Sequence, residues 1–284
     1  MSATPTIGAL WRGWRDVLER QGFASAALDA KLLAGHGLGL STLDMALREN
    51  ELVDDAQAGQ VAALLQRRLT GESVARIIGE REFYGLAFAL NAATLEPRPE
   101  TELLVDMALD ALPQGGRLLD LGTGTGCIPI AVLVNRSDAR GVATDLSVEA
   151  LAAARGNAER HGVVERLDFG EGDWFGALGA TSRFDLITSN PPYINSAVIE
   201  TLEEEVKSFD PRLALDGGPD GLTPYRVIAA EAGNWLKPGG LVLVETGYDQ
   251  GEAVADLFVG AGFAGVMVHK DLNGLDRVVI AHHV

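Results

Sequence analysis

Apolar residues recur at helical spacing in the first 72 residues of the chain. Three sets each fall on one helical face: Leu10, Trp14, Val17 and Leu18; Leu28, Leu32 and Leu33; and Val61, Leu64, Leu65 and Leu69. Ser41 and Asp44 have the spacing of a capping box, with Asp in the place of the usual Glu. The pattern predicts a small helical bundle over residues 1–72, which serves either to recognise a partner or to stabilise the chain.

Two strand-like runs follow the bundle. They are Val74–Ile78 and Leu86–Leu90, with Gly79 and Gly85 in or beside their connection. Short runs of this kind joined through glycine are typical of a β-hairpin. We expect a hairpin over residues 73–96 that links two domains.

From residue 97 to residue 284, short apolar runs alternate with helix-like stretches. The strand candidates are Arg117–Leu121, Gly141–Thr144, Leu167–Phe169, Phe184–Ile187, Leu241–Glu245, Gly265–His269 and Arg277–Ala281. Helix-like stretches separate the first five, which is typical of a mostly parallel sheet covered on both faces. The predicted fold class is α/β, with a seven-stranded sheet in a second domain over residues 97–284.

Composition and charge narrow the class of partner. The chain has 284 residues, of which 47% are hydrophobic and 22% charged, as in an ordinary globular protein. Its formal net charge is −17 and its pI is near 4.6, so it lacks the general phosphate attraction that dominates nucleic-acid binding. A protein partner is favoured over a nucleic acid, although a local basic patch is compatible with this total.

Cysteine and histidine usage gives little support to a disulfide or a metal site. Cys127 is the single cysteine, so no intramolecular disulfide can form, and the five histidines are scattered. The amino terminus lacks a signal-peptide core, and no apolar run approaches transmembrane length. We expect a cytoplasmic monomer that holds no metal and contacts no membrane.

The segment hardest to explain as ordinary structure is Asn190-Pro191-Pro192-Tyr193, here called the proline loop. It follows the apolar run Phe184–Ile187, so Asn190 lies at the carboxyl end of a strand, the edge where open α/β sheets bind ligands. The prolines stiffen the chain and leave two fixed acceptors, the Asn190 side-chain oxygen and the Pro191 carbonyl. Together with the Tyr193 ring, these two acceptors are suited to bind a planar –NH2 group. In an isolated sequence, however, the same four residues are as often a structural loop in which the Asn caps the backbone.

A glycine-rich turn follows the first strand candidate. This glycine loop, Gly122-Thr123-Gly124-Thr125-Gly126, has neither the G-x-G-x-x-G spacing of dinucleotide sites nor the Lys-Ser/Thr pair of a phosphate-binding loop. Asp145 ends the next strand candidate, where a carboxylate can accept both hydroxyls of a ribose. Asp120, just before the loop, suits a turn or a contact to an ammonium group. These residues predict S-adenosylmethionine, a nucleoside with an amino-acid tail and no pyrophosphate.

Trp174 is a further candidate for the cofactor site. With Asp173 it follows the third strand candidate, where its indole could lie beside the adenine. A half-buried Trp after a helix cap explains the same residues equally well.

Several segments together resemble a known family. Three segments resemble a class I S-adenosylmethionine-dependent methyltransferase that acts on amino groups. They are Asp120–Gly126, Asp145 and Asn190–Tyr193. Three further stretches are similar to the peptide chain release factor N5-glutamine methyltransferases, the PrmC/HemK family. They are Pro97–Leu104, Pro211–Gly218 with Asp220–Leu222, and Gly247–Gly251. The similarity extends over nearly the whole chain.

The resemblance implies a Rossmann-like methyltransferase domain and a bundle that recognises the release factor. The implied reaction is methylation of the side-chain amide of the glutamine in the Gly-Gly-Gln motif of bacterial class I release factors. The residues implied to bind the cofactor are Gly122, Thr123, Gly124, Thr125, Gly126, Asp145, Trp174 and Asn190. Those implied for the glutamine are Asn190, Pro191, Pro192 and Tyr193, with Asn190, Pro191 and Tyr193 catalytic. Glu96 departs from the family, which usually has an aliphatic residue there.

An amide nitrogen is a poor nucleophile because its lone pair is delocalised. If Asn190 and the Pro191 carbonyl accept both of its N–H groups, they can aim that lone pair at the methyl group without a dedicated general base. The exocyclic amines of nucleic-acid bases present the same –NH2, so methylation of adenine N6 or guanine N2 is the alternative, against which the acidity of the chain argues. A non-catalytic binding module is a third hypothesis, which the intact proline loop disfavours.

Overall fold

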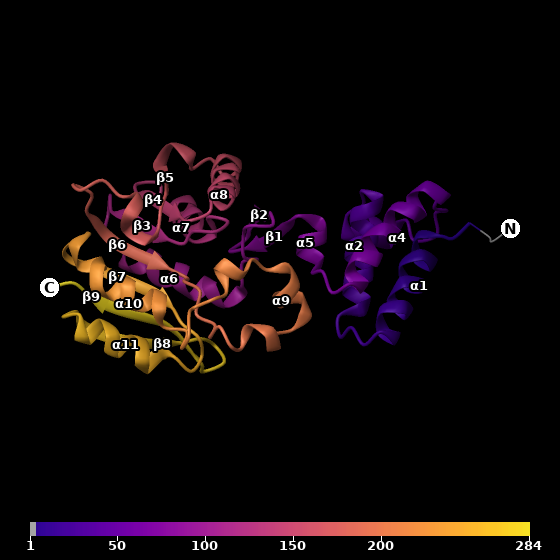
Figure 1. Ribbon diagram of the computed structural model, residues 1–284. Helices are drawn as coiled ribbons and strands as arrows, with labels where there is room; N and C mark the ends of the chain where they lie inside the picture. The colour runs from indigo at the N-terminus through magenta and orange to yellow at the C-terminus, as the bar shows by residue number, and fades with distance from the viewer. Residues whose placement is uncertain (1–3) are drawn as a thin grey trace. The chain divides into compact units, whose positions relative to one another are not determined.

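In the computed structural model, which describes residues 4–284, the chain divides into two units between Gly79 and Glu80 (Figure 1). The first unit is helical, with α1 (Ile7–Arg20), α2 (Ala26–Leu38), α3 (Thr42–Leu47), α4 (Asp55–Leu69) and α5 (Val74–Ile78). The capping box opens α3, because the Ser41 hydroxyl accepts from the Asp44 N–H and Asp44 Oδ2 accepts from the Ser41 N–H. The predicted helical bundle is confirmed.

Helix α2 buries small residues rather than some of its leucines. Ala30 is fully buried, whereas Leu28 is 60% and Leu32 is 37% exposed. Leu33 of the same helix is fully buried, and α4 approaches α2 closely at Gly37, where a Cβ would lie 3.0 Å from Val61 Cγ2. The predicted apolar face of this helix is wrong at Leu28 and Leu32.

The hairpin lies within the predicted range 73–96 and its second strand is confirmed, but its first strand begins later in the chain than predicted. β1 (Glu80–Phe83) and β2 (Leu86–Ala89) pair antiparallel across Tyr84 and Gly85. Both turn residues have positive φ, as a type I′ turn requires. Two buried rings of the hairpin join the core of the second unit: Phe83 and Phe88.

Val74–Ile78, expected as the first strand of the hairpin, is the short helix α5 instead. The Ser73 hydroxyl accepts from the Arg76 N–H and so caps the amino end. Gly79 ends the helix with φ +83, a left-handed conformation that favours glycine. This cap and stop override the β-propensity of valine and isoleucine.

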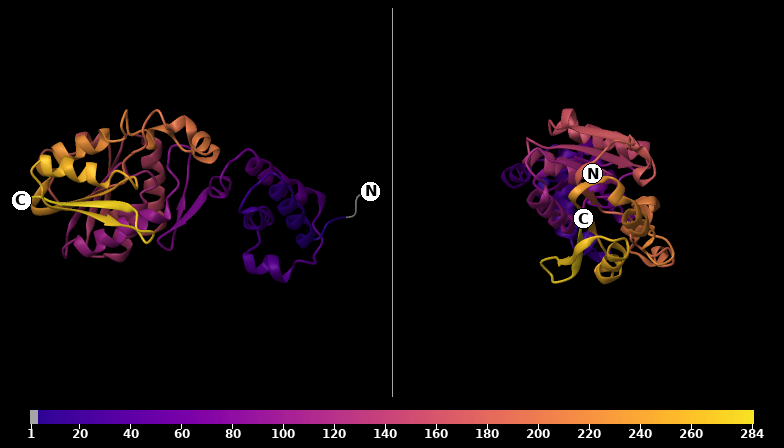
Figure 2. Two further views of the ribbon diagram at one scale, coloured as in Figure 1. Left: turned by 90° about the horizontal axis from the view of Figure 1, so that it is seen from below. Right: turned by 90° about the vertical axis from the view of Figure 1, so that its left-hand side faces the viewer.

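The second unit is built on a seven-stranded sheet. Its strands are β3 (Arg117–Leu121), β4 (Arg140–Asp145), β5 (Leu167–Glu171), β6 (Phe184–Ser189), β7 (Leu236–Glu245), β8 (Ala264–Lys270) and β9 (Asp276–His282). They lie in the order β5-β4-β3-β6-β7-β9-β8, in which β3 to β7 are parallel and β9 is antiparallel to both neighbours. β8 and β9, yellow in Figure 2, close one edge. The predicted α/β fold with seven strands is confirmed.

Helices cover both faces of this sheet (Figure 1). α6 (Glu102–Ala111), α7 (Cys127–Asn135) and α8 (Val148–Arg160) contribute to one core, and α10 (Thr223–Glu231) and α11 (Gly251–Gly260) to the other. The stretch between β5 and β6 differs from expectation, since it holds only the 3-10 turn η3 (Trp174–Ala177) rather than a full helix.

Shorter elements complete the second unit. They are η1 (Pro99–Thr101), η2 (Val164–Arg166), η4 (Ile199–Thr201), α9 (Glu204–Phe209), η5 (Arg212–Ala214) and η6 (Ala232–Asn234). Within residues 4–284, no helix combines the length and the apolar character that crossing a bilayer demands.

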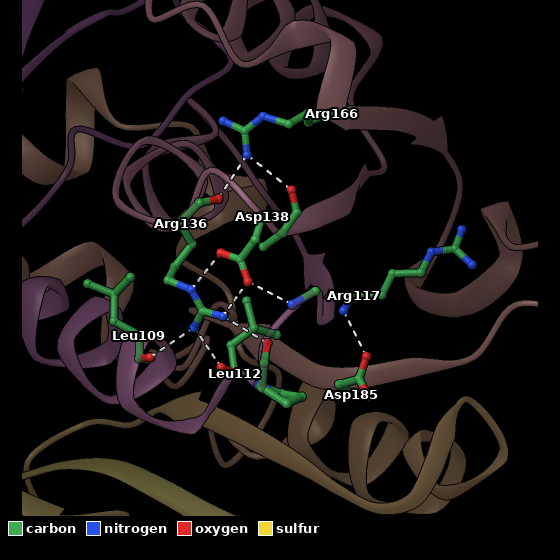
Figure 3. A network of polar contacts seen from close by, with 10 residues as sticks. Leu109, Leu112, Arg117, Arg136, Asp138, Arg166 and Asp185 are labelled. Carbon is green, nitrogen blue, oxygen red and sulfur yellow. Dashed lines mark hydrogen bonds and ion pairs between the residues drawn. The ribbon is translucent and has the colours of Figure 1, made fainter.

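A network of charged side chains fastens the amino ends of the strands (Figure 3). Arg136 Nη1 donates to Leu112 O at 2.6 Å, and Arg136 Nη2 donates to Asp138 Oδ2 at 2.9 Å. Asp138 also accepts from the Gly115 N–H at 2.7 Å, and Arg166 Nη1 donates to Arg136 O at 2.9 Å. Hydrogen bonding to Arg136 holds the pKa of Asp138 well below its usual range. These contacts fix the loops that lead into β3, β4 and β5.

The opposite, carboxyl edge of the sheet carries both loops noted in the sequence. β3 and β6 are adjacent and parallel, and their last residues, Leu121 and Ser189, are paired. Ser189 Oγ donates to Leu121 O at 2.8 Å. The order of the strands reverses between β3 and β6, and such a switch point is where open α/β sheets bind ligands.

Candidate active site

A cavity of about 510 Å³ opens at this switch point. Eight residues expected at the site line it: Gly122, Thr123, Gly124, Thr125, Asp145, Trp174, Asn190 and Pro192. Tyr193 lines an adjoining cavity of about 380 Å³, and Asn190 lines both. Gly126 and Pro191 are buried and are not part of the wall of either cavity. The structure thus gathers residues from four strand ends around one space.

The glycine loop is shaped by its own backbone. Gly122 and Gly124 have φ of +67 and +56, which residues with a side chain rarely adopt. The Thr123 N–H donates to Thr144 O at 2.9 Å, and the Gly124 N–H donates to Asp145 Oδ2 at 2.8 Å. The loop is therefore held against the end of β4, with its backbone exposed along the cavity.

Gly126 has a packing role in this loop. Its φ is +78, and a Cβ there would lie 2.8 Å from Ile130 Cδ1 and 3.1 Å from Ala154 Cβ. Glycine is needed so that the start of α7 can approach α8.

Asp145 is half-buried at the end of β4 and holds two backbone segments. Oδ2 accepts from Gly124 N–H, and Oδ1 accepts from Ser147 N–H at 2.9 Å. Each carboxylate oxygen has a second lone pair, so both can still accept a hydroxyl hydrogen from a ligand.

Asp120 is fully buried at the end of β3, beneath the glycine loop. Its Oδ1 accepts from Thr188 Oγ1 at 2.7 Å, whereas Oδ2 has no hydrogen-bond partner within residues 4–284. Burial raises the pKa of Asp120 to about 7. A buried carboxylate with an unfilled acceptor is costly unless positive charge lies nearby, although Asp120 itself does not line the cavity.

Trp174 begins η3 and has φ of +48, an unusual conformation for a bulky residue. Its carbonyl accepts from Thr144 Oγ1 at 3.4 Å. Strained backbone of this kind is concentrated at functional sites, and here it sets the indole on the wall of the larger cavity.

Cys127 lines the same cavity but is unreactive. Burial raises the pKa of its thiol to about 12, so it is a neutral, small apolar residue at neutral pH. Among the described residues no group of three or more acidic, histidine or cysteine side chains is placed to hold a metal.

The Asn190 side chain has a defined neighbour. Its Nδ2 donates to Thr101 Oγ1 at 3.2 Å, which leaves Oδ1 on the other end of the carboxamide as an acceptor. Thr101 is buried at the junction of η1 and α6, 89 residues earlier in the chain. This contact explains why the segment around Pro99 belongs to the site.

Gln250 holds the far end of the proline loop. Its Nε2 donates to Tyr193 O at 3.0 Å, and its Oε1 accepts from the Gly247 N–H at 3.1 Å. Space is tight on this side, because a Cβ on Gly221 would lie 2.4 Å from Tyr193 O and one on Gly217 would lie 2.8 Å from Tyr193 Cα. The glycine-rich stretches that the sequence singled out therefore pack against the proline loop.

Glu245 is a residue of the site that sequence reasoning missed. It ends β7, is 1% exposed and lines the smaller cavity with Asn190 and Tyr193. Its Oε2 has no hydrogen-bond partner among the described residues. Burial raises the pKa of Glu245 to about 7 and that of Tyr193 to about 12. The available sequence signal was an acid at the carboxyl end of a strand, the same signal that identified Asp145.

Two ion pairs join segments at the mouth of the site. Glu96, buried where the family usually has an aliphatic residue, pairs with Arg81 Nη1 at 3.3 Å. Arg98 Nη2 donates to Asp210 Oδ2 at 2.8 Å. The unusual Glu96 is therefore compensated by a cation from β1.

Comparisons with known proteins agree with this architecture. The PrmC N-terminal domain matches residues 9–79, and the methyltransferase small domain matches residues 98–214. A crystal structure of a methyltransferase from Pyrococcus furiosus has a TM-score of 0.54 at 18% identity, covering 78% of this chain and 98% of that chain, a likeness that shows the fold alone.

Curated relatives are similar over nearly the full length. The release factor glutamine methyltransferase of Agrobacterium fabrum is 43% identical over 280 residues, covering 96% of this chain and 96% of that protein. The release factor glutamine methyltransferase of Caulobacter vibrioides is 43% identical over 279 residues, covering 98% of this chain and 96% of that protein. At this identity and coverage, the chain belongs to the release factor glutamine methyltransferase family.

Proposed function

We propose that the protein transfers a methyl group from S-adenosylmethionine to the side-chain amide nitrogen, N5, of the glutamine in the Gly-Gly-Gln motif of bacterial class I peptide chain release factors. The observation that carries this proposal is the proline loop, with the Asn190 carboxamide oriented by Thr101 at the wall of a cavity large enough for the cofactor. The names of the curated relatives support the same substrate class.

The residues of the larger cavity fit S-adenosylmethionine, which supplies an electrophilic methyl group when bound. The backbone of the glycine loop would allow close approach of the amino-acid tail, and the buried Asp120 behind it would favour the ammonium group electrostatically. Asp145 would accept hydrogen bonds from the ribose hydroxyls, and Trp174, on the cavity wall, would hold the adenine.

The proline loop positions the glutamine amide. Asn190 Oδ1 and the Pro191 carbonyl accept its two N–H groups, which draws the nitrogen toward tetrahedral geometry and aims its lone pair at the cofactor. Tyr193, kept neutral by burial, holds the amide plane rather than acting as a base. No general base is required, because the nitrogen becomes strongly acidic once it carries the methyl group and then loses its proton.

The first unit recognises the release factor in this proposal. Support comes from its match to the PrmC N-terminal domain and from exposed leucines on and near α2 and α3: Leu28, Leu32, Leu43, Leu47 and Leu52. Exposed apolar side chains of this kind are favoured contacts for a protein partner. The protein acts as a cytoplasmic monomer on this partner.

The nucleic-acid alternative has less support. A net charge of −17 disfavours phosphate binding, and the curated relatives with 40–45% identity carry the release factor name. The discriminating experiment offers labelled S-adenosylmethionine with release factor, free nucleic acid and bulk protein side by side. Label is expected in the release factor alone, on the Gly-Gly-Gln glutamine by mass spectrometry, and a release factor with alanine at that position is the control. Label in nucleic acid, or in the alanine control, would overturn the proposal.

A further inference from the structure

Glu245 is a buried acid that the mechanism above leaves without a task. It is 1% exposed at the end of β7 and lines the smaller cavity together with Asn190. Tyr225 Oη donates to its backbone carbonyl at 2.8 Å, which fixes the main chain at this point. Its carboxylate has one unfilled acceptor, Oε2, within the described residues. A carboxylate desolvated in this way is costly unless it accepts hydrogen bonds.

Thr101 by itself does not determine which end of the Asn190 carboxamide faces the substrate. A hydroxyl can donate or accept, so it can bond to either Nδ2 or Oδ1 of Asn190. Only the orientation with Nδ2 at Thr101 leaves the oxygen available for a substrate N–H, and that is the orientation present, at 3.2 Å. Something must bias the hydroxyl toward accepting.

We propose that Glu245 is a positioning residue that sets the polarity of this contact. An ionised carboxylate can only accept hydrogen bonds. It accepts hydrogen bonds from the Thr101 hydroxyl and from the Asn190 carboxamide, whose only donor is Nδ2. Thr101 Oγ1 therefore accepts from Asn190 Nδ2, and Asn190 Oδ1 is directed to the glutamine amide. This role rests on the proposed amide methylation and adds to it the group that keeps the acceptor correctly oriented.

The surroundings of Glu245 are consistent with a role in its ionised form. Burial is the largest influence and raises its pKa to about 7, while hydrogen bonding from Thr101 and Asn190 lowers it. The charged and titratable groups that interact with it from neighbouring elements are Arg277 of β9, Glu100 of η1, Tyr193 of the proline loop, Tyr225 of α10 and Cys127 of α7, and Arg98 lines the same smaller cavity. A protonated Glu245 would donate to Thr101 and favour the reversed carboxamide, so kcat should fall as the pH drops below this pKa.

The test uses the full chain at saturating cofactor and release factor. Glu245→Gln is nearly isosteric but can donate, so kcat should fall roughly 10- to 100-fold, the usual range for a residue that orients a reacting group. Cofactor affinity should not change, and the loss of activity on the acid side should disappear from the pH profile of kcat. Thr101→Val removes one of the two contacts to Glu245 and should lower kcat no more than Glu245→Gln does, and Thr101→Ser should retain activity because it keeps the hydroxyl.

A double variant separates positioning from general damage. Asn190→Asp carries oxygen at both ends, so orientation no longer matters, and adding Glu245→Gln should not lower its kcat further. The inference would be overturned if Glu245→Gln lowered kcat equally in the wild-type and the Asn190→Asp background. It would also be overturned if Glu245→Gln alone had the kcat and the pH profile of the wild type.

A readout without turnover keeps this test independent of the proposed function. The side-chain NH2 signal of Asn190 in nitrogen-edited NMR should be protected from exchange in the wild type. It should lose protection in Glu245→Gln and at a pH below the Glu245 pKa. Unaltered protection in both cases would contradict the inference, whereas failure of the wild type to methylate a release factor would overturn only the reaction assigned to the site.

Discussion

The glycine loop and the proline loop lie side by side at the carboxyl edge of the sheet but are held in different ways. The glycine loop uses its own backbone and the end of the next strand, through Gly124 and Asp145. The proline loop is held by side chains from distant parts of the chain, Thr101 at one end and Gln250 at the other. A nucleoside site can be built locally, whereas aiming an acceptor at a reacting amide requires support from several elements.

The difference also assigns separate tasks to the two loops. Changes in the glycine loop or Asp145 should act on cofactor affinity. Changes in the proline loop or its supports should act on kcat at saturating cofactor.

The largest effect is expected for Asn190→Ala. The variant loses an acceptor that acts mainly in the transition state, and removal of one such preorganised group typically lowers the rate roughly 10²- to 10³-fold. Steady-state kinetics with release factor at saturating cofactor measures this. Asn190→Asp is the matched control and should keep more activity because it retains acceptor oxygens. If Asn190→Ala has nearly the kcat of the wild type, Asn190 only shapes the loop and does not take part in catalysis.

Asp145→Ala should weaken cofactor binding. Hydrogen bonds to a charged group contribute about 1.5–3 kcal/mol each, so the loss of even one amounts to roughly a 10- to 100-fold rise in Kd. Calorimetry on the folded variant measures it. Asp145→Asn is the control, since it keeps one acceptor oxygen at the Gly124 N–H or toward the ribose. Unchanged affinity in Asp145→Ala would place the ribose elsewhere.

Gln250→Glu should have a smaller effect on kcat. It keeps the acceptor for the Gly247 N–H but cannot donate to the Tyr193 carbonyl. A neutral hydrogen bond contributes about 1 kcal/mol, so kcat should fall by roughly fivefold with cofactor affinity unchanged. Gln250→Ala, which loses both contacts, should fall further. Equal kcat in the wild type and both variants would show that the proline loop is rigid without this support.

The double variant Leu43→Ser/Leu47→Ser tests the first unit. Both leucines are exposed, 67% and 74%, so the change should leave its stability and cofactor affinity intact. The KM for release factor should rise by roughly thirtyfold if both side chains contact it, since interface residues that matter cost over about 1 kcal/mol each. An unchanged KM would count against recognition through α3.

Arg136→Ala should have no effect on catalysis. Its network lies at the amino ends of the strands (Figure 3), whereas both loops follow the carboxyl ends of β3 and β6. The variant should lower the free energy of unfolding by about 2 kcal/mol, because carbonyl acceptors and Asp138 lose a charged partner. Urea unfolding and kcat measured together check this. A loss of kcat in the folded variant would show that the two edges of the sheet are coupled.

The sequence predicts the parts of this molecule that are local along the chain. The alternation of apolar runs predicted all seven strands, and the spacing of Ser41 and Asp44 predicted the start of α3. Val74–Ile78 was missed because a cap and a terminating glycine decided between helix and strand against β-propensity. Leu28 was placed on the apolar face because periodicity does not show how wide the buried face of a helix is.

In the site, as in the fold, the sequence predicted the local features and not the contacts between distant segments. The glycine loop and Asp145 are neighbours through adjacent strands, so pattern and spacing brought them together. Glu245 and Thr101 reach Asn190 through folding over long separations, and neither has a local pattern that distinguishes it from a strand end or a helix start. Their roles emerge only from contacts in space.

The separation of tasks between the two loops is tested most directly by measuring cofactor Kd and saturated kcat for both Asp145→Ala and Asn190→Ala. We expect Asp145→Ala to raise Kd while its kcat at saturating cofactor stays near that of the wild type. For Asn190→Ala we expect the reverse, with kcat reduced roughly 10²- to 10³-fold and a much smaller change in Kd. Equal losses of affinity and of saturated rate in both variants would contradict the separation of tasks.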